Sequence, residues 1–432
     1  MDLHNTQTEY DVLIVGAGVA GLSCALHLPA SVKALVISKG GLRESDSFLA
    51  QGGICVLRDC EDFDSYFEDT MRAGHFENDS DTVKCMIEHS RETIDELISL
   101  GVRFARERDG SLSYTREGAH SRPRIVFHKD CTGREITSRL LKKVTALPNV
   151  TLRPHTTLID VLTDGARCFG GVVRDNKSGE LCAVYAKNTV LATGGVGGLF
   201  RHSTNYRILT GDGIAVSLRH GVAVDHADYV QIHPTTLYTK KRGRRFLISE
   251  SVRGEGAHLI NAKGERFVDE LLPRDAVAEA IFREMEKEGS SFVRIDLRTV
   301  QGGSSALLKH FPGIVKRCRE EGYDPLEEPV PVVPAQHYFM GGVRSDRTGR
   351  TTLPHLYAVG ETCCNGVHGK NRLASNSLLE SIVFARRAAE DIAKDTSFIE
   401  HTDVDFSQYA NYRKLAKQDK NRVLKEIHGE NK

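Results

Sequence analysis

Short apolar runs alternate with amphipathic segments along the chain, a pattern typical of an α/β protein. Residues 10–15 are mostly apolar and indicate a buried parallel strand, and residues 22–28 continue as a helix after a glycine-containing turn. In such a turn the first glycine permits the sharp bend, the second lets a phosphate approach and the third lets the helix pack closely. The pattern predicts a dinucleotide site in which the four residues between the outer glycines face the pyrophosphate. The residues of this turn are Gly16, Ala17, Gly18, Val19, Ala20 and Gly21.

The second predicted strand, residues 34–37, ends at Ser38 and Lys39. Sites for NAD usually carry an aspartate or glutamate at this position, which binds the ribose. Because Lys39 stands there instead, we expect a larger dinucleotide that the protein holds at several points.

Two later segments, residues 189–195 and 357–361, also run from an apolar strand into a glycine. Three strands that each end in a glycine turn, at the start, middle and end of the chain, imply one dinucleotide-binding domain built from segments that are distant in the sequence. The predicted fold class is therefore α/β, with a discontinuous Rossmann-like domain, an inserted α+β capping domain and a short helical C-terminal tail. The predicted boundaries are 1–225 and 342–393 for the Rossmann-like domain, 226–341 for the capping domain and 394–432 for the tail.

Further elements follow from periodicity and from stop signals. Residues 81–100 are expected to form one long amphipathic helix that ends before Gly101, and residues 133–144 another helix. Three small antiparallel strands are expected at residues 151–162, 170–175 and 182–185.

The segment 359–380 carries the most specific chemistry. It follows a short strand at residues 354–358, contains Glu361 and Arg372 in a glycine-rich loop, and begins a helix at Asn376. The free N–H groups of a helix start receive an anion or a carbonyl, and an arginine holds a planar carboxylate with two parallel hydrogen bonds. This combination predicts a cofactor in contact with an acidic substrate.

The composition excludes several classes of protein. The chain has 432 residues, with 58 basic and 58 acidic side chains, so a nucleic-acid partner is not expected. We interpret the basic run at residues 240–245 as a solvated loop. The first ten residues are polar, and no apolar run reaches the roughly 18 residues that a membrane span needs. We therefore expect a cytoplasmic protein without a membrane partner.

Ten cysteines occur without a Cys-x-x-Cys pair. Reduced, unligated thiols are the expected state in such a protein. No metal site is predicted.

Several motifs together resemble one flavoprotein superfamily. They are the segments 16–21, 50–54 (Ala-Gln-Gly-Gly-Ile), 192–195 (Ala-Thr-Gly-Gly), 231–235 (Gln-Ile-His-Pro-Thr) and 253–256 (Arg-Gly-Glu-Gly). As a set they resemble the fumarate reductase and succinate dehydrogenase flavoproteins. Within that superfamily, residues 116–121 and 368–378 are most similar to the L-aspartate oxidase family. The resemblance covers about residues 9–393 and implies FAD as the cofactor.

Two sequence positions distinguish the respiratory enzymes from the aspartate oxidases. In the respiratory enzymes the residue four positions before Ala50 is a histidine that carries covalent flavin, whereas here it is Asp46. The resemblance therefore implies that FAD is bound without a covalent link. The respiratory enzymes also lack an acid at the position of Glu117, which aspartate oxidases have. An extra carboxylate suits an ammonium group that succinate does not possess.

The resemblance assigns the substrate contacts. Arg372 and His337 would hold one carboxylate of the substrate, and His233 and Ser249 would hold the other. Arg274 corresponds to the arginine that transfers a proton in the family.

An arginine is a poor base at its ordinary pKa, so the role of Arg274 requires a special environment or a shuttle. Glu250 and Arg253 are the groups expected to relay the proton or to orient this arginine.

The same resemblance assigns the cofactor contacts. Lys39 and the segment 46–53 would wrap the adenosine and flavin sides, Glu361 would bind the ribityl chain, and Asp212 would contact the flavin region or act only as a turn residue. The N–H groups of Ser377 and Leu378 would meet the carbonyl edge of the isoalloxazine. The residues of the wrapping segment are Asp46, Ser47, Phe48, Leu49, Ala50, Gln51, Gly52 and Gly53.

The function that the resemblance implies is oxidation of L-aspartate to iminoaspartate, with oxygen or fumarate as acceptor, as the first step towards quinolinate and NAD. Quinolinate synthase is a candidate partner because iminoaspartate is unstable. The alternative is a soluble fumarate reductase or succinate dehydrogenase-like flavoprotein, and a third class is a flavin-bearing sensor or assembly protein. Aspartate oxidases usually continue into a longer C-terminal helical domain, whereas this sequence stops at Lys432.

Overall fold

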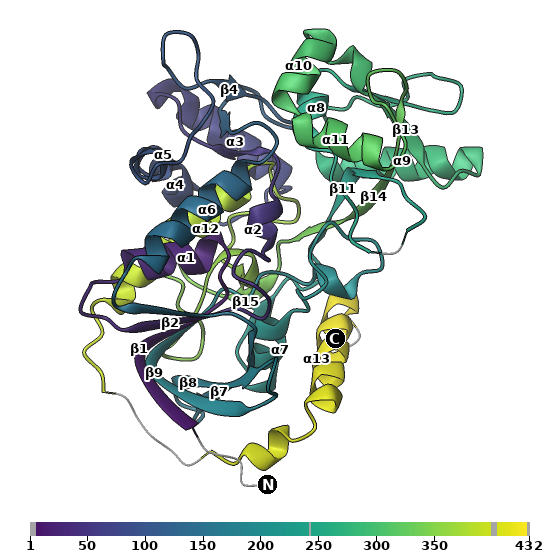
Figure 1. The fold of residues 1–432 in the computed structure, drawn as a ribbon. Helices are drawn as coiled ribbons and strands as arrows, with labels where there is room; N and C mark the ends of the chain where they lie inside the picture. Colours follow the sequence, from purple (N-terminus) through teal and green to yellow (C-terminus); the bar gives the residue numbers. More distant parts are fainter. Residues whose placement is uncertain (1–5, 242, 399–403, 430–432) are drawn as a thin grey trace.

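The computed structural model describes residues 6–241, 243–398 and 404–429, and a seven-stranded sheet forms its centre (Figure 1). The strand order is β6-β2-β1-β9-β8-β7, and β16 pairs with β9 outside this path. The strands are β1 (Thr6–Val15), β2 (Ala34–Ile37), β6 (Val150–Arg153), β7 (Thr156–Thr163), β8 (Cys168–Asp175), β9 (Leu181–Leu191) and β16 (Leu356–Ala358).

Three strand ends meet at one edge of this sheet. Val15 of β1 lies in register with Leu191 of β9, and Leu191 lies in register with Ala358 of β16, all in parallel pairs. The glycine turns that follow these strands therefore open on the same side. Gly16 has φ +126°, and a Cβ there would lie 1.9 Å from the carbonyl oxygen of Ala192, so only glycine allows this close approach. The discontinuous dinucleotide fold is confirmed.

The sheet differs from the prediction in two places. The expected strand 151–162 is two strands, because the chain turns at Pro154 and at His155, which has φ +56°. The first of them, β6, pairs in parallel with β2, so the prediction that this segment is wholly antiparallel is wrong. The expected strands 182–185 and 189–191 are one continuous strand, β9, because the whole length of β1 pairs with it.

Each face of the sheet carries its own apolar core. Val12 and Ile14 of β1 face a layer made by α1 (Val19–His27), α6 (Thr132–Thr145) and α12 (Asn376–Ile392). Leu13 and Val15 face α7 (Asp212–Arg219) and the strands β7 and β8. The alternation of side chains along a strand explains this division, and a fully buried aliphatic side chain contributes about 1.5–3 kcal/mol.

The predicted helix 81–100 is two helices, α4 (Ser80–Glu88) and α5 (Ser90–Ser99), interrupted at His89. The hydroxyl of Ser90 donates to the carbonyl oxygen of Ile87 and accepts from the N–H of Leu57, at 2.6 and 2.9 Å. A serine hydroxyl that bonds the backbone competes with the helical ladder, which is the physical reason for the break.

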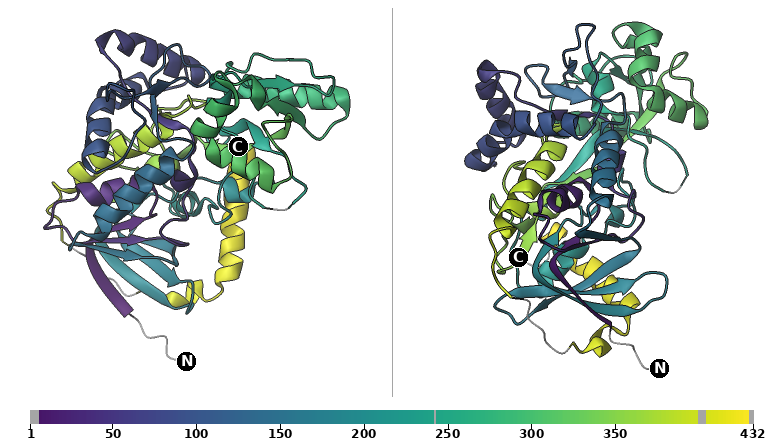
Figure 2. Two further views of the ribbon diagram at one scale, coloured as in Figure 1. Left: turned by 45° about the horizontal axis from the view of Figure 1, so that its top comes forward. Right: turned by 60° about the vertical axis from the view of Figure 1, so that its left-hand side comes forward.

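A second lobe rises from the segment that was predicted to be the capping domain. In both views of Figure 2 the green residues of this lobe stand at one end of the molecule, away from the large sheet. Its sheet has the order β11-β14-β13-β12 and its own apolar core, which includes Leu237, Ile281 and Val332. Its elements are β11 (Val230–Leu237), α8 (Glu250–Gly254), β12 (His258–Ile260), α9 (Arg274–Glu288), β13 (Val293–Asp296), η3 (Leu297–Thr299), α10 (Gly303–His310), α11 (Pro312–Glu320) and β14 (Val330–Phe339).

The two strands that flank this lobe pair with each other at its base. Val224 of β10 (Val224–Asp225) lies opposite Val343 of β15 (Gly342–Arg344). The chain thus leaves and re-enters the Rossmann-like domain at neighbouring points. We propose residues 226–341 as the inserted domain on this basis.

The C-terminal segment is helical, as expected for the tail. It consists of η5 (Phe406–Tyr409) and α13 (Tyr412–His428), and Val423 and Ile427 of α13 pack in the same core as Ile214 of α7. Residues 399–403 and 430–432 of the predicted tail lie outside the described residues. The remaining elements are α2 (Asp46–Leu49), β3 (Gly53–Cys55), η1 (Cys60–Asp62), α3 (Phe63–Ala73), β4 (Tyr114–Thr115), β5 (Ile125–Phe127), η2 (Gly197–Leu199), η4 (Gly360–Thr362) and β17 (Cys363–Cys364).

Candidate active site

One cavity joins the glycine turns of the large sheet to the base of the second lobe. Its volume is about 1630 Å³, including space open to solvent. All seven predicted catalytic residues line it: Glu117, His233, Ser249, Glu250, Arg274, His337 and Arg372. Seventeen predicted cofactor residues line it as well: Gly16, Ala17, Gly18, Val19, Ala20, Lys39, Asp46, Ser47, Leu49, Ala50, Gln51, Gly52, Gly53, Asp212, Glu361, Ser377 and Leu378.

Two predicted cofactor residues lie outside this lining and have other roles. A Cβ on Gly21 would lie 2.0 Å from the carbonyl oxygen of Gly16, so this glycine lets α1 pack against the turn. The ring of Phe48 lies 5.9 Å from the guanidinium of Arg134 on α6. Both residues therefore support the walls of the cavity.

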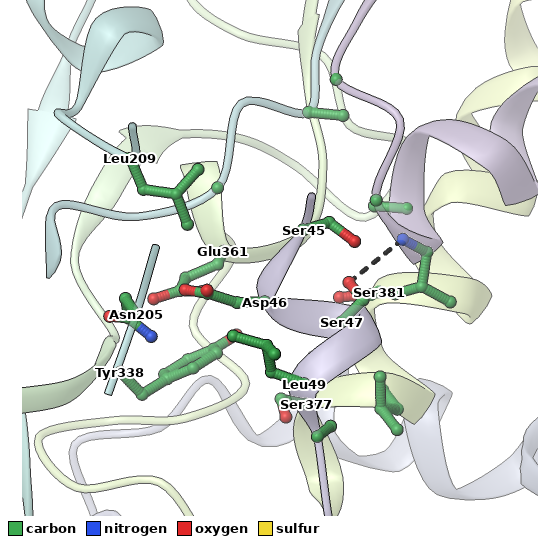
Figure 3. A pocket seen from close by; sticks show the side chains of 18 of the residues that line it. Ser45, Asp46, Ser47, Leu49, Asn205, Leu209, Tyr338, Glu361, Ser377 and Ser381 are labelled. Carbon is green, nitrogen blue, oxygen red and sulfur yellow. Dashed lines mark hydrogen bonds between the residues drawn. The ribbon is translucent and has the colours of Figure 1, made fainter. Parts of the chain in front are cut away.

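The pyrophosphate end of the cavity offers backbone donors at the start of α1. Gly18 is the N-cap residue of α1 and has no side chain to cover those N–H groups. The N–H of Val19 donates to the hydroxyl of Ser47 at 3.1 Å (Figure 3). This hydrogen bond satisfies one of the free N–H groups and connects α2 to the glycine turn.

Lys39 is paired with an acid across the cavity. Its ammonium donates to Asp212 Oδ2 at 2.7 Å and to the hydroxyl of Thr210 at 2.8 Å. Asp212 therefore lies beside the residue predicted for the adenosine side, and its contact with the flavin region stays a prediction.

Asp46 and Glu361 extend into the same part of the cavity (Figure 3). Asp46 Oδ1 accepts from the N–H of Tyr206 at 2.9 Å, and Glu361 Oε1 accepts from the N–H of Phe339 at 3.0 Å. Burial raises the pKa of Asp46 to about 7. Burial and the neighbouring Asp46 raise the pKa of Glu361 to about 8. Both carboxyl groups of the ligand-free site therefore keep their protons to a higher pH than an exposed carboxyl group does.

Asp46→Asn is expected to make the ligand-free protein more stable than the wild type, by a margin that grows between about pH 4 and pH 7. Burial raises the pKa of Asp46 in the folded chain from 3.8 to about 7, so in this window the unfolded chain releases a proton that the folded chain keeps. The wild-type folded state therefore loses stability as the pH rises, and the neutral asparagine does not. The melting temperature of the apoprotein across this pH range measures the effect.

Asp391→Asn is the control for this titration. Arg350 lowers the pKa of Asp391, so its carboxylate contributes stability that is present at neutral pH and lost as the pH falls. This variant should thus be destabilised at pH 7. A constant difference in melting temperature between Asp46→Asn and the wild type at every pH would contradict the assignment.

Arg372 is the buried cation at the substrate end. One terminal N–H group donates to the hydroxyl of Ser377 at 2.6 Å, and the guanidinium lies 4.0 Å from the ring centroid of Tyr338. The Nε atom has no hydrogen-bond partner within the described residues. Burial, and then the neighbouring Arg274, lower the pKa of Arg372 to about 10, so it stays charged at neutral pH. The group is suited to receive a carboxylate.

Two neutral histidines face the same space, with ring centroids 5.0 Å apart. The Nδ1 atom of His233 accepts from the N–H of Thr235 at 3.1 Å, so the neutral ring carries its proton on Nε2. That Nε2 has no partner among the described residues. His337 Nδ1 is bonded to the hydroxyl of Thr204 at 2.7 Å. Burial and nearby arginines hold both pKa values well below the usual range, so both rings are uncharged at neutral pH.

Arg274 is held between two side chains at the start of α9. Its Nε–H donates to Glu250 Oε2 at 2.5 Å, and one terminal N–H donates to Gln231 Oε1 at 2.7 Å. Arg253 lies 3.5 Å from the same Glu250 oxygen. Burial alone would raise the pKa of Glu250, but Arg274 and Arg253 outweigh it and lower the pKa below its ordinary value. Glu250 is therefore an ionised carboxylate between two arginines.

Glu117 is a second buried carboxylate in the cavity wall, with 2% of its surface exposed. Its two oxygens accept from the hydroxyls of Ser251 and Ser375, at 2.5 and 2.6 Å. Burial, and then Glu250, raise its pKa above the ordinary value. Neither serine was predicted from the sequence, because the motifs mark Glu117 but carry no signal for its distant partners.

Ser249 is engaged at the start of α8. Its hydroxyl accepts from the N–H of Ser251 at 3.2 Å and also bonds the Ser251 hydroxyl at 3.1 Å. It thus caps this short helix, and its predicted contact with a substrate carboxylate stays a prediction.

The basic run 240–245 is not only a solvated loop, which corrects the prediction. Arg245 is buried, with 8% of its surface exposed, and Arg244 lines the cavity. Lys241 forms an ion pair with Glu321 at 2.8 Å. Arg242 lies outside the described residues. Sequence reasoning missed Arg244 and Arg245 because a dense run of like charges does not show which of its members line a cavity or become buried.

The described part of the chain carries no sign of a metal site, a disulfide or a membrane span. No group of three or more histidine, cysteine or acidic side chains there has an arrangement that could hold a metal ion. No disulfide joins the cysteines of these residues. Among the helices that the structure describes, none is long and apolar enough to cross a membrane.

Comparison with known proteins shows the family to which this chain belongs. Residues 11–378 match the family described as FAD binding domain. The chain is 50% identical over 383 residues to an L-aspartate oxidase of Clostridium perfringens, covering 88% of this chain and 86% of that protein. It is 46% identical over 400 residues to an L-aspartate oxidase of Clostridium acetobutylicum, covering 92% and 91%. The chain belongs to the L-aspartate oxidase family.

Solved structures of more distant proteins share the fold of this L-aspartate oxidase family member. A quinol fumarate reductase from E. coli superposes with a TM-score of 0.85 at 31% identity, covering 96% of this chain and 74% of that chain. A flavocytochrome c3 fumarate reductase superposes with a TM-score of 0.69 at 26% identity, covering 90% and 78%. The resemblance to this flavoprotein superfamily is confirmed.

FAD is the cofactor that this cavity fits. The glycine turn and Lys39 line the same cavity, and Gly18 puts no side chain over the free N–H groups at the start of α1, which suits a phosphate. Three buried side-chain oxygens in the lining have no hydrogen-bond partner in the described structure: Ser45 Oγ, Asp46 Oδ2 and Gln51 Oε1. A ligand with hydroxyl and N–H groups, such as the ribityl and ring portions of FAD, would satisfy them.

Proposed function

We propose that this protein oxidises L-aspartate to iminoaspartate with FAD as its cofactor and oxygen or fumarate as the electron acceptor. The observation that carries the proposal is the position of Glu117. This carboxylate lies in the wall of the same cavity as the cationic and donor groups Arg372, His233 and His337. The cavity thus offers a site for two carboxylates and, beside them, an acceptor for one ammonium group.

The donors match the two carboxylates of L-aspartate. Arg372 with His337 would hold one carboxylate, and His233 with Ser249 would hold the other. The unpartnered N–H groups, Arg372 Nε and His233 Nε2, are the donors open to a ligand. A hydrogen bond to a charged group contributes about 1.5–3 kcal/mol, so these contacts position the substrate firmly.

Glu117 would accept a hydrogen bond from the α-ammonium group. Its raised pKa in the free site comes from burial and from Glu250, and a bound cation would offset both effects. The serine hydroxyls of Ser251 and Ser375 orient the carboxylate for this contact. Succinate and fumarate cannot make the contact, because they have no ammonium group.

The oxidation removes a hydride equivalent from Cα and a proton from the nitrogen, which leaves the C=N double bond of the product. FAD, when bound, supplies the two-electron acceptor. Arg274 would serve as a proton shuttle, because its Nε–H already donates to the ionised Glu250 at 2.5 Å. A proton that reaches one nitrogen of Arg274 can be matched by transfer of the Nε proton to Glu250 Oε2, which leaves Arg274 a cation and Glu250 neutral, and Arg253 would orient Glu250 for this transfer.

The second candidate is a soluble fumarate reductase or succinate dehydrogenase-like flavoprotein. The likeness to fumarate reductase structures favours it, and the dicarboxylate donors fit both functions. A buried acid next to those donors distinguishes the two, since it would repel a dicarboxylate without an ammonium group. A flavin-bearing sensor would need none of these donors.

The reaction suggests a place in metabolism and a partner. Iminoaspartate is unstable in water, so an enzyme that consumes it directly, such as quinolinate synthase on the route to NAD, is the partner that we propose. A cytoplasmic location accords with this role.

Anaerobic mixing of the purified holoenzyme with L-aspartate tests the proposal. The flavin absorbance should bleach with L-aspartate, and it should bleach far more slowly with an equal concentration of succinate. Bleaching by succinate alone would overturn the proposal in favour of the second candidate. Bleaching by neither compound would overturn both.

FAD is expected to be released intact when the protein is precipitated with acid, because Asp46 stands where the respiratory relatives have the flavin-linked histidine. The yellow colour should remain in the supernatant, and its absorbance measures the released fraction. Flavin that stays with the washed pellet would show a covalent link and would contradict the prediction. A respiratory relative with covalent flavin, treated in parallel, is the control for complete precipitation.

A further inference from the structure

A second cavity lies beside the pair of strands that carries the two active-site histidines. Its volume is about 1420 Å³, including space open to solvent. Ile232 of β11 and Gln336 of β14 are register partners and line it, whereas their neighbours His233 and His337 line the first cavity. The linings of the two cavities have no residue in common, so the second cavity is a separate space beside the β11–β14 pair, and Figure 1 labels these two strands at the base of the second lobe.

The lining of this second cavity is cationic. Arg201, Lys240, Arg245 and His202 contribute to it, and none of its lining residues is acidic. None of the first three forms an ion pair with a side chain that the structure describes. The pKa of Arg245 is lowered by burial and that of His202 by burial and by Arg245, which accords with positive charge that no carboxylate offsets.

Two buried donors in the lining lack partners. Arg245, with 8% of its surface exposed, donates from its terminal nitrogens to Thr239 and His202, but its Nε–H has no partner. Gln336, with 1% exposed, accepts at Oε1 from the hydroxyl of Ser203 at 2.5 Å, but its Nε2 has no partner. A buried donor left without an acceptor destabilises the ligand-free cavity, and an anionic ligand would offset that effect.

The rest of the wall is apolar and rich in flat rings. The ring centroids of Tyr238, which is in the lining, and Phe292 lie 4.9 Å apart with the ring planes tilted by 38°, and Phe282 of the lining is 48% exposed. The apolar lining residues are Phe200, Ile232, Tyr238, Phe282, Met285, Val333, Pro334 and Ala335.

We propose that this cavity is a second ligand site, separate from the substrate site, that takes an aryl carboxylate. The carboxylate would accept from Gln336 Nε2 and Arg245 Nε, with Lys240 and Arg201 supplying further positive charge. The flat apolar body of the ligand would lie against the aromatic wall. L-Aspartate does not fit this description, because it has no apolar body and the lining has no acid for its ammonium group.

Equilibrium dialysis of the holoenzyme against 2-naphthoate tests the proposal. Saturating fumarate is included to fill the substrate site, so the readout does not depend on catalysis or on the proposed function. We expect about one equivalent of 2-naphthoate bound per chain. The neutral isostere 2-naphthamide and the small anion acetate should each bind at least about tenfold more weakly. The first compound lacks the negative charge, and the second lacks the aromatic body.

Two matched double variants test whether 2-naphthoate binds in the second cavity. Arg201→Ala with Lys240→Ala removes two lining cations and should weaken binding of 2-naphthoate about tenfold. Lys241→Ala with Arg319→Ala removes two exposed cations that pair with Glu321 and Asp324 outside the lining, and it should leave binding unchanged. Displacement of 2-naphthoate by fumarate, equal effects in both double variants, or the absence of saturable binding would each overturn the proposal.

Discussion

Arg372→Leu is expected to remove most of the turnover of L-aspartate while FAD remains bound. The guanidinium is buried, has an unpartnered Nε–H and lies among the donors of the substrate end, so its loss leaves a substrate carboxylate buried without its cation. Removal of one partner from a buried charged pair costs roughly 2–5 kcal/mol, which corresponds to a fall of about 30-fold to several-thousand-fold in kcat/KM. Steady-state kinetics and the flavin content of the purified variant measure the two halves of this prediction.

Ser377→Ala is the matched control for Arg372. It removes the hydrogen bond that Arg372 makes at 2.6 Å but keeps the guanidinium. A small change in kcat/KM in this variant, beside a large one in Arg372→Leu, would assign the effect to the charge. An unchanged kcat and KM in Arg372→Leu would show that Arg372 is only a structural residue.

Glu117→Gln should separate the two activities that the dicarboxylate site could support. The change keeps the shape of the side chain and removes the charge that would pair with the α-ammonium group. Oxidation of L-aspartate should fall by about one to three orders of magnitude, because a hydrogen bond to a charged group contributes about 1.5–3 kcal/mol and a buried unpaired ammonium costs more. Reduction of fumarate, assayed with a reduced dye, should survive or improve, since a like charge near the dicarboxylate is gone.

The structure also supplies a competing explanation and its control. Both Glu117 oxygens accept from serine hydroxyls, so the residue could brace the loops that carry Ser251 and Ser375. Ser251→Ala removes one of these braces and leaves the carboxylate charge. If bracing were the role of Glu117, both activities and the melting temperature would fall together in Glu117→Gln, and Ser251→Ala would reproduce part of that loss. Equal loss of the two activities in Glu117→Gln would contradict recognition of the ammonium group.

The sequence by itself determined the features that depend on neighbouring residues. A buried strand, a glycine turn and a helix start are local patterns, so the dinucleotide turn at residues 16–21 and the helix beginning at Asn376 are found where they were expected. The motif residues that line the active cavity were also identifiable, because each stands in a short and specific context. Arg372, His233 and Glu117 are three examples.

Only the tertiary structure decided features that rest on contacts between distant parts of the chain. The break at His89 follows from the contact of Ser90 with Leu57, and the fusion of two expected strands into β9 follows from its pairing with the whole of β1. The serine partners of Glu117 lie 134 and 258 positions away along the chain. Local pattern sets which conformations a segment prefers, but hydrogen bonds and burial across the folded chain select among them, and these cannot be seen in any short window of sequence.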